Sequence, residues 1–235
     1  MERLNPLLVE LTRVLATTPP EQPISIRMCT AFAEIVDAQG GSVAVGLDPQ
    51  ERVVLCATDA HAARVEDMQD VLGEGPCLDV ARSGTAVTGL SPAEQRYRWP
   101  LYFDLLDEAG PPLSLQVFPL MPQAVVLGTL CVYRTDPGDL AKPPEDAQLL
   151  ANAIGVALLG DASMSEVSDE RWTSRDQIDH ATGMVIAQLR LPPADALAVL
   201  RAHAFAHSTT LGVVSGWVLD RTLDFNDDDS KDGNP

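Results

Sequence analysis

The chain has 235 residues, with 16 lysines and arginines against 34 aspartates and glutamates, for a formal net charge of −18. This length leaves room for one medium-sized domain and a small one, and so acidic a chain is not expected to bind nucleic acid over its whole surface. No apolar run reaches the length of about 18 residues that predicts a membrane helix, and no signal peptide is expected. Four cysteines without a CxxC pair fit a cytoplasmic protein with buried thiols.

Residues 1–160 are predicted to form one α+β domain, an antiparallel sheet flanked by helices. Strands are expected where β-branched and apolar residues run between turn signals, and helices where apolar residues recur every three or four positions. The expected elements, in chain order, are an amphipathic segment over 4–15, a helix over 24–37, strands over 42–47 and 52–58, strands over 115–120 and 124–133, and a helix over about 145–159.

The middle of this domain, residues 59–112, carries two short motifs. One is Gly73-Glu74-Gly75-Pro76-Cys77-Leu78-Asp79, and the other is Arg98-Trp99-Pro100-Leu101-Tyr102. Cys77 lies in the glycine-rich motif, where an accessible thiol with a possible redox role is expected. The other cysteines, Cys29, Cys56 and Cys131, lie in apolar or strand-like surroundings and are expected to be buried.

The order helix, hairpin, variable middle, hairpin, helix, together with the two motifs, resembles a GAF domain over roughly residues 5–160. The resemblance implies a domain that binds a small molecule or mediates dimerisation. No ligand or cofactor is indicated, since His61 is the only histidine before residue 180 and no haem, bilin or metal set stands out. A scaffold without a ligand is an equal alternative.

Two further alternatives concern this part of the chain. GAF-fold enzymes that reduce methionine sulfoxide use a loop cysteine, which would be Cys77 here, although the surrounding pattern is not theirs. The helix over 145–158 either covers its own sheet or forms a dimer contact, with candidate residues Leu149, Leu150, Ala153, Val156 and Ala157. Residues 161–173 are predicted to be a linker or a helical extension.

Residues 174–225 are predicted to form three short helices. Ser174 is expected to cap the first, Pro192 and Pro193 to open the second, and Ser208-Thr209-Thr210 to cap the third. Gly183 interrupts the first helix, which suggests close packing there. Apolar residues at helical spacing predict a shared core of Ile178, Ala181, Val185, Leu189, Leu197, Leu200, Ala204, Leu211, Val214, Val218 and Leu219.

The charge of this helical segment differs from that of the rest. Residues 171–223 hold five arginines and four aspartates, a net charge of +1, whereas residues 1–167 hold 10 basic and 23 acidic residues, a net charge of −13. A near-neutral segment in an acidic chain permits nucleic-acid binding. The alternative is an ordinary solvated surface.

The same stretch resembles an ANTAR domain, a small RNA-binding module of bacterial, and especially actinobacterial, antitermination regulators. The matching positions are Ile178, Ala181, Gly183, Asp195-Ala196, Leu200-Arg201 and Ala204. The sequence departs from the pattern at Thr182, where many members have lysine, and at His180, where glutamine is common. The missing lysine would remove one phosphate contact.

The resemblance implies a GAF–ANTAR regulator that binds paired RNA stem-loops, acts as a homodimer and performs no catalysis. The residues expected to contact RNA are Arg175, Arg190, Arg201, Thr209 and Arg221, and those expected to pack the module are Ile178, Ala181, Gly183, Leu200 and Ala204. The alternative is a module that binds protein. His203 and His207 have a possible metal spacing, but no third ligand lies nearby, so no metal is expected. Residues 226–235 are predicted to be a disordered acidic tail.

Overall fold

The structure, a computed structural model, describes residues 5–46, 52–108, 113–122, 125–136, 138–160 and 164–225, without the side chains of 107–108 and 164–175. The predicted acidic tail lies outside these residues. The chain divides into two compact units. The first comprises residues 1–69 and 74–167, and the second comprises residues 70–73 and 168–235.

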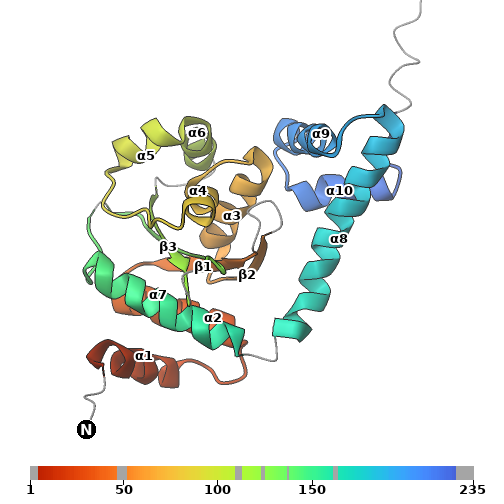
Figure 1. The fold of residues 1–235 in the computed structure, drawn as a ribbon. Helices are drawn as coiled ribbons and strands as arrows, with labels where there is room; N and C mark the ends of the chain where they lie inside the picture. Colours follow the sequence, from red (N-terminus) through yellow and green to blue (C-terminus); the bar gives the residue numbers. More distant parts are fainter. Residues whose placement is uncertain are drawn as a thin grey trace, which may run out of the picture. The chain divides into compact units, whose positions relative to one another are not determined.

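An antiparallel sheet lies at the centre of the first unit (Figure 1). Its strands are β1 (Gly40–Val45), β2 (Val53–Ala57), β3 (Ser114–Leu120) and β4 (Gly128–Arg134), in the order β2-β1-β4-β3. Both predicted hairpins form, and each strand lies within a few residues of its expected place. The two hairpins join because β1 pairs with β4, so that Ser42 lies opposite Cys131 and Val43 opposite Leu130.

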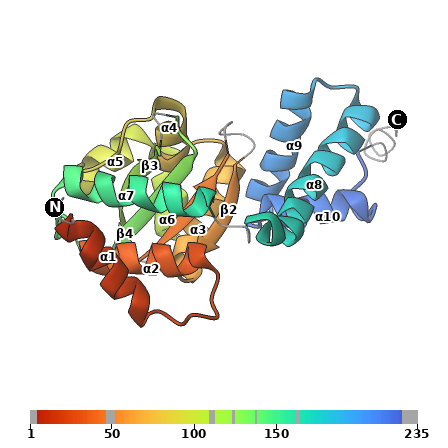
Figure 2. The same cartoon turned by 60° about the horizontal axis from the view of Figure 1, so that its bottom comes forward.

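One face of the sheet is covered by α2 (Ile24–Val36) and α7 (Pro144–Leu159). Because side chains alternate along a strand, one set of residues points to these helices, and Phe118 packs edge-on against Phe32 at 5.6 Å between ring centroids. Helix α1 (Pro6–Thr17) packs outside α2 and α7 (Figure 2). Other residues that fill this core are Val43, Leu120, Leu130, Val132, Leu150, Ile154 and Leu158.

A pair of thiols lies on this face. Cys29 of α2 and Cys56 of β2 are 0% and 3% exposed, as the sequence predicted. The hydrogen bond between the two thiols, together with burial, raises the pKa of Cys29 well above its usual value of 9.0. Both effects disfavour the thiolate, because the charged form would lose its hydration in an apolar core.

The other face of the sheet is covered by the middle segment, which forms helices. They are α3 (Ala60–Leu72), α4 (Pro76–Ser83), α5 (Pro92–Arg98) and α6 (Pro100–Glu108). The glycine-rich motif forms the junction of α3 and α4. Gly75 has φ of 143°, and a Cβ there would lie 2.4 Å from the side chain of Gln69, so no other residue fits without a shift of that side chain.

The second unit is built from α8 (Met164–Leu189), α9 (Pro193–Ala206) and α10 (Leu211–Leu219). Helix α8 begins ten residues before Ser174, so the expectation that Ser174 caps this helix is wrong. The helical-extension alternative agrees with the structure from residue 164 onward. The other two starts are as predicted, since Pro193 occupies the first turn of α9 and the Thr210 hydroxyl accepts a hydrogen bond from Val213 N–H at 3.3 Å.

The three helices share the predicted core. Ala181, Val185, Leu200, Ala204, Val214 and Val218 are each 0% exposed.

Among the described residues no single helix is long and apolar enough to cross a membrane. Asp176–Leu189 and Pro193–Ala206, bent by 106°, reach that length and hydropathy only when taken together.

The buried thiol of Cys29 predicts a loss of stability in alkali. Its pKa is raised in the folded state, so its contribution is fully present below about pH 9 and is lost as the pH rises above that value, where the unfolded chain alone releases the proton. We expect the free energy of unfolding to fall above pH 9, by up to about 1.4 kcal/mol per pH unit for this thiol.

Urea unfolding at about pH 8 and about pH 10, compared between the wild type and Cys29→Ala, measures this effect. The free energy of unfolding should fall less between these two pH values in Cys29→Ala than in the wild type. An equal drop in both proteins would assign the alkaline loss to other groups.

Candidate functional site

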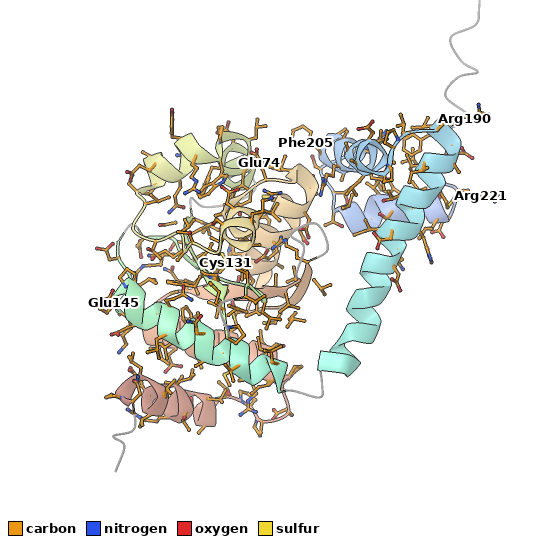
Figure 3. The ribbon with its side chains drawn as sticks, viewed as in Figure 1. Glu74, Cys131, Glu145, Arg190, Phe205 and Arg221 are labelled. Carbon is orange, nitrogen blue, oxygen red and sulfur yellow. The ribbon has the colours of Figure 1, made fainter. Side chains whose placement is uncertain are left out.

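The helical unit places two of the predicted RNA-binding arginines at helix ends. Arg190 directly follows α8, and Arg221 comes two residues after α10. Both side chains are exposed. Figure 3 shows them on the same side of the helical unit. A planar guanidinium group in such a position can grip a phosphate with two hydrogen bonds or stack on a base.

Both arginines have the left-handed backbone conformation. The φ angle is 56° at Arg190 and 58° at Arg221. Arg190 N–H donates to Ile186 O at 2.8 Å, and Thr222 N–H donates to Trp217 O at 2.8 Å, so these residues close their helices. Helices usually end this way on glycine, because other residues in this conformation strain the backbone by about 1–2 kcal/mol. A strained residue at a helix end is a candidate for a functional role of its side chain.

Ser208 provides an internal comparison. It follows α9 with φ of 51°, and Thr209 N–H donates to Ala204 O at 3.0 Å. All three helices of this unit therefore end on a left-handed residue other than glycine. Ser208 carries the same strain without a charge.

The remaining predicted contact residues are placed differently. Arg201 lies on α9 and Thr209 lies just before α10, and both are half-buried. The backbone of Arg175 belongs to α8, and its side chain is outside the described part of the chain. Among the predicted contact residues whose side chains are described, Arg190 and Arg221 are therefore the two that are exposed.

Gly183 does not have the packing role that its position suggested. It is exposed on α8, and nothing lies within 4 Å of where a Cβ would stand. The expectation of close packing is therefore wrong, whereas Ala181, Leu200 and Ala204 lie in the core and Ile178 packs against it. Without packing, glycine inside a helix costs about 1 kcal/mol relative to alanine. Because Gly183 has no side chain, a ligand could approach the backbone of α8 closely at this position.

Thr182, the position that departs from the ANTAR pattern, is satisfied within its own helix. Its hydroxyl donates to Ile178 O at 2.7 Å, and the side chain is half-buried. The hydroxyl of Thr182 is therefore occupied within its own helix, and the side chain has no charge with which to bind a phosphate.

An aromatic cluster joins the end of α9 to α10. The rings of His203 and His207 stack at 5.9 Å, His207 contacts Trp217, and His203 contacts Phe225. These ring contacts give the histidine pair a packing role in the helical unit. Apart from the spacing of four between the two histidines, no local pattern predicts this cluster.

The first unit has a polar centre between the sheet and its middle helices. Glu66 of α3 is 1% exposed, and its carboxylate accepts hydrogen bonds from the Ser42 hydroxyl and the Arg52 guanidinium, each at 2.5 Å. A buried carboxylate is strongly destabilising unless it is paired and hydrogen-bonded. The Arg52–Glu66 ion pair satisfies both needs.

Cys77 lies beside this carboxylate, not in an accessible loop. It is 0% exposed, belongs to the first turn of α4, and its Sγ lies 3.7 Å from Glu66 Oε1. The expectation of an accessible, reactive thiol is wrong, because Gln69 fixes the glycine-rich junction by accepting from Cys77 N–H at 2.7 Å. Burial removes the basis of the sulfoxide reductase alternative.

Cys131 of β4 faces Cys77 from the sheet. Figure 3 shows Cys131 in the interior of the first unit. The hydrogen bond with Cys77, together with burial, raises the pKa of the Cys131 thiol well above 9.0. Tyr102 closes the same centre, and its hydroxyl donates to Val65 O at 3.1 Å.

The two sequence motifs of the middle segment meet in space. Asp79, the last residue of the glycine-rich motif, accepts from the indole N–H of Trp99 at 3.0 Å and forms an ion pair with Arg98 at 3.4 Å. The Arg98 guanidinium also lies 4.7 Å from the centre of the Trp99 ring. These contacts give the motifs a structural role in holding α4 against the turn between α5 and α6.

Comparison with protein families identifies both units. Residues 24–158 match the GAF domain, and residues 169–219 match the ANTAR domain. A comparison with curated proteins found no match. The GAF match covers more than half of the chain, which makes this a GAF-domain protein.

With an ANTAR domain after the GAF domain, the chain belongs to the GAF–ANTAR regulators. ANTAR domains are RNA-binding modules of transcription antitermination, and GAF domains are sensor domains. Both are regulatory and non-catalytic domain types.

The strained arginines predict opposite changes in stability and RNA binding. Arg190→Gly and Arg221→Gly should each raise the free energy of unfolding by roughly 0.5–1 kcal/mol, because glycine adopts φ near 60° without strain. Each should also weaken binding to a stem-loop RNA and lower the slope of log affinity against log salt by about 0.7–0.9, the value for one phosphate contact.

Ser208→Gly is the matched control, since it relieves the same strain without removing a charge. Urea unfolding and filter binding at several salt concentrations measure the two quantities. Arginine variants that gain stability but bind RNA like the wild type would show that the two side chains are ordinary surface.

Proposed function

We propose that this chain binds a pair of RNA stem-loops in a nascent transcript and prevents formation of a terminator, under control of its GAF domain. The observation that carries the proposal is the exposed pair Arg190 and Arg221, kept at helix ends where glycine would be more stable. RNA loops suit such a surface because splayed bases and phosphates are open to side chains, whereas the deep groove of an RNA duplex is closed.

Charge supports the same surface. The segment 171–223 has a net charge of +1 in a chain of −18, so the RNA backbone would be repelled by most of the protein and least by this segment. On helix α8, nothing lies within 4 Å of where a Cβ of the exposed Gly183 would stand, so a sugar-phosphate backbone could approach the helix closely there. The expected affinity is therefore sensitive to salt.

A homodimer would bring two such modules to two stem-loops. Helix α7 carries Leu149, Val156 and Leu159 at 37%, 55% and 56% exposure, spaced by seven and then three residues. This spacing places them on one stripe of the helix, as in a coiled-coil seam. Leu150, one of the predicted dimer residues, instead lies in the core of its own unit.

The alternative is a helical module that binds a protein. Phe205 and Val213 support it, since these apolar residues of the second unit are 55% and 43% exposed. A protein partner would use these apolar groups, whereas RNA would use the arginines.

A gel-shift assay with the full-length protein separates the two functions. The probe is an RNA with two adjacent hairpins, and the control RNA has the same composition with scrambled stems. We expect selective binding to the hairpins that weakens steeply with salt. Equal binding to both RNAs, or none, would favour the protein-binding alternative.

The same assay includes Thr182→Lys, which restores the lysine common in ANTAR domains. The added cation should steepen the salt dependence by about 0.7–0.9 in slope and tighten binding at low salt. Unchanged affinity and an unchanged salt slope would place position 182 away from the RNA.

The dimer is tested by Val156→Glu combined with Leu159→Glu. Two carboxylates on the proposed seam should leave the fold intact, because both residues are exposed, and should convert the dimer to a monomer by light scattering. Thr17→Glu, an exposed change on α1, is the control and should leave the mass unchanged. A monomeric wild type would exclude the proposed dimer.

A further inference from the structure

Three metal-ligating side chains from separate parts of the chain converge in the GAF domain. They are Glu66 of α3, Cys77 of α4 and Cys131 of β4, and the carboxylate oxygen and two sulfur atoms all lie within 4.8 Å of one another. Their exposures are 1%, 0% and 2%, so the group is enclosed by protein. No metal was expected in this domain, because His61 is the only histidine before residue 180 and no metal-ligating set stands out in the sequence.

The spacing suits a tetrahedral ion of the zinc class. With bonds of about 2.3 Å to sulfur and about 2.0–2.2 Å to oxygen, two ligand atoms of a tetrahedral site lie roughly 3.5–3.8 Å apart. The Cys77 Sγ to Glu66 Oε1 distance is 3.7 Å. An ion can therefore contact both atoms without movement of α3 or α4. Two sulfurs and one oxygen favour zinc over magnesium or calcium, which prefer oxygen alone.

Neighbouring side chains hold the carboxylate in a ligating orientation. Arg52 binds Glu66 Oε2, and the Ser42 hydroxyl binds Oε1, the oxygen that faces Cys77. Arg52 also donates to the Glu66 backbone carbonyl at 3.3 Å. Metal-ligating carboxylates are typically fixed by such outer hydrogen bonds, which set the direction of the free lone pair.

The charges balance with a divalent ion. Two thiolates, one carboxylate, one guanidinium and one doubly charged cation sum to zero, so the loaded centre would carry no net buried charge. Binding releases the two thiol protons to solvent, because a coordinated thiol is deprotonated. Burial is no obstacle, since structural zinc is taken up as a domain folds.

We propose that the GAF domain binds one zinc-class ion through Cys77, Cys131 and Glu66, with a water molecule as the fourth ligand. The ion would join α3, α4 and β4 around one point and thereby stabilise the middle segment of the domain. This proposal does not depend on the RNA-binding function.

The second thiol pair provides a matched control. Cys29 and Cys56 are also buried and in contact, but they lie on the opposite face of the sheet and do not belong to the group with Glu66. Glu66→Gln is unsuitable as a test, because it would also remove the negative charge that pairs with the buried Arg52 guanidinium.

The first experiment measures metal content by mass spectrometry after full-length protein without a histidine tag is refolded with zinc and dialysed against a weak chelator. We expect about one zinc per wild-type chain, the same in Cys29→Ala/Cys56→Ala, and at least about tenfold less in Cys77→Ala/Cys131→Ala. Equal zinc in all three proteins, or none in the wild type, would overturn the proposal.

The second experiment needs no variant and so decides the question even if the double variant fails to fold. The wild type is refolded with cobalt(II), and its absorption spectrum is recorded. Thiolate ligation should give a sulfur-to-cobalt charge-transfer band in the near ultraviolet together with the visible bands of a tetrahedral site. A folded protein with neither band would exclude thiolate ligation.

Discussion

The ion pair of Arg52 and Glu66 is the constraint on which the GAF domain depends. Burying either charge without the other would lower the stability of the fold by several kcal/mol. The elements that carry the two charges must therefore pack together. Glu66 comes from α3, Arg52 leads into β2, and Ser42, which shares the carboxylate, comes from β1. Apolar contacts alone would allow α3 to shift along the sheet. The directional hydrogen bonds to Glu66 allow one position of α3 against the sheet.

Sequence reasoning succeeded where periodicity carries the information. The two hairpins, the apolar faces of α2 and α7, and the helix starts at Pro193 and Thr210 follow from local patterns. It failed where the deciding partner is distant in the chain. Cys77 looked accessible because a glycine-rich stretch suggests a loop, but Gln69 and the sheet enclose it. Likewise, no local signal shows that Ser42, Glu66 and Cys131 meet.

The two units use their less favourable residues in different ways. In the GAF domain, the buried groups of Ser42, Arg52 and Glu66 hydrogen-bond to one another, and these bonds offset the free-energy cost of burying them. In the ANTAR domain, the unfavourable features lie at the surface: left-handed arginines at two helix ends and an unpacked glycine in α8. Features of this kind persist where a ligand completes the interactions. If these residues bind RNA as proposed, stability and binding make opposite demands on the helical unit.

The pairing of β1 with β4 also determines when the protein becomes able to work. About 80 residues separate these strands in the chain, so the sheet of the GAF domain cannot close until most of that domain has left the ribosome. The ANTAR helices are made after the GAF domain and pack against near neighbours in sequence, which favours fast folding. A newly made chain would thus close a slow, non-local sheet in its GAF domain, whereas its ANTAR helices could fold soon after they emerge from the ribosome.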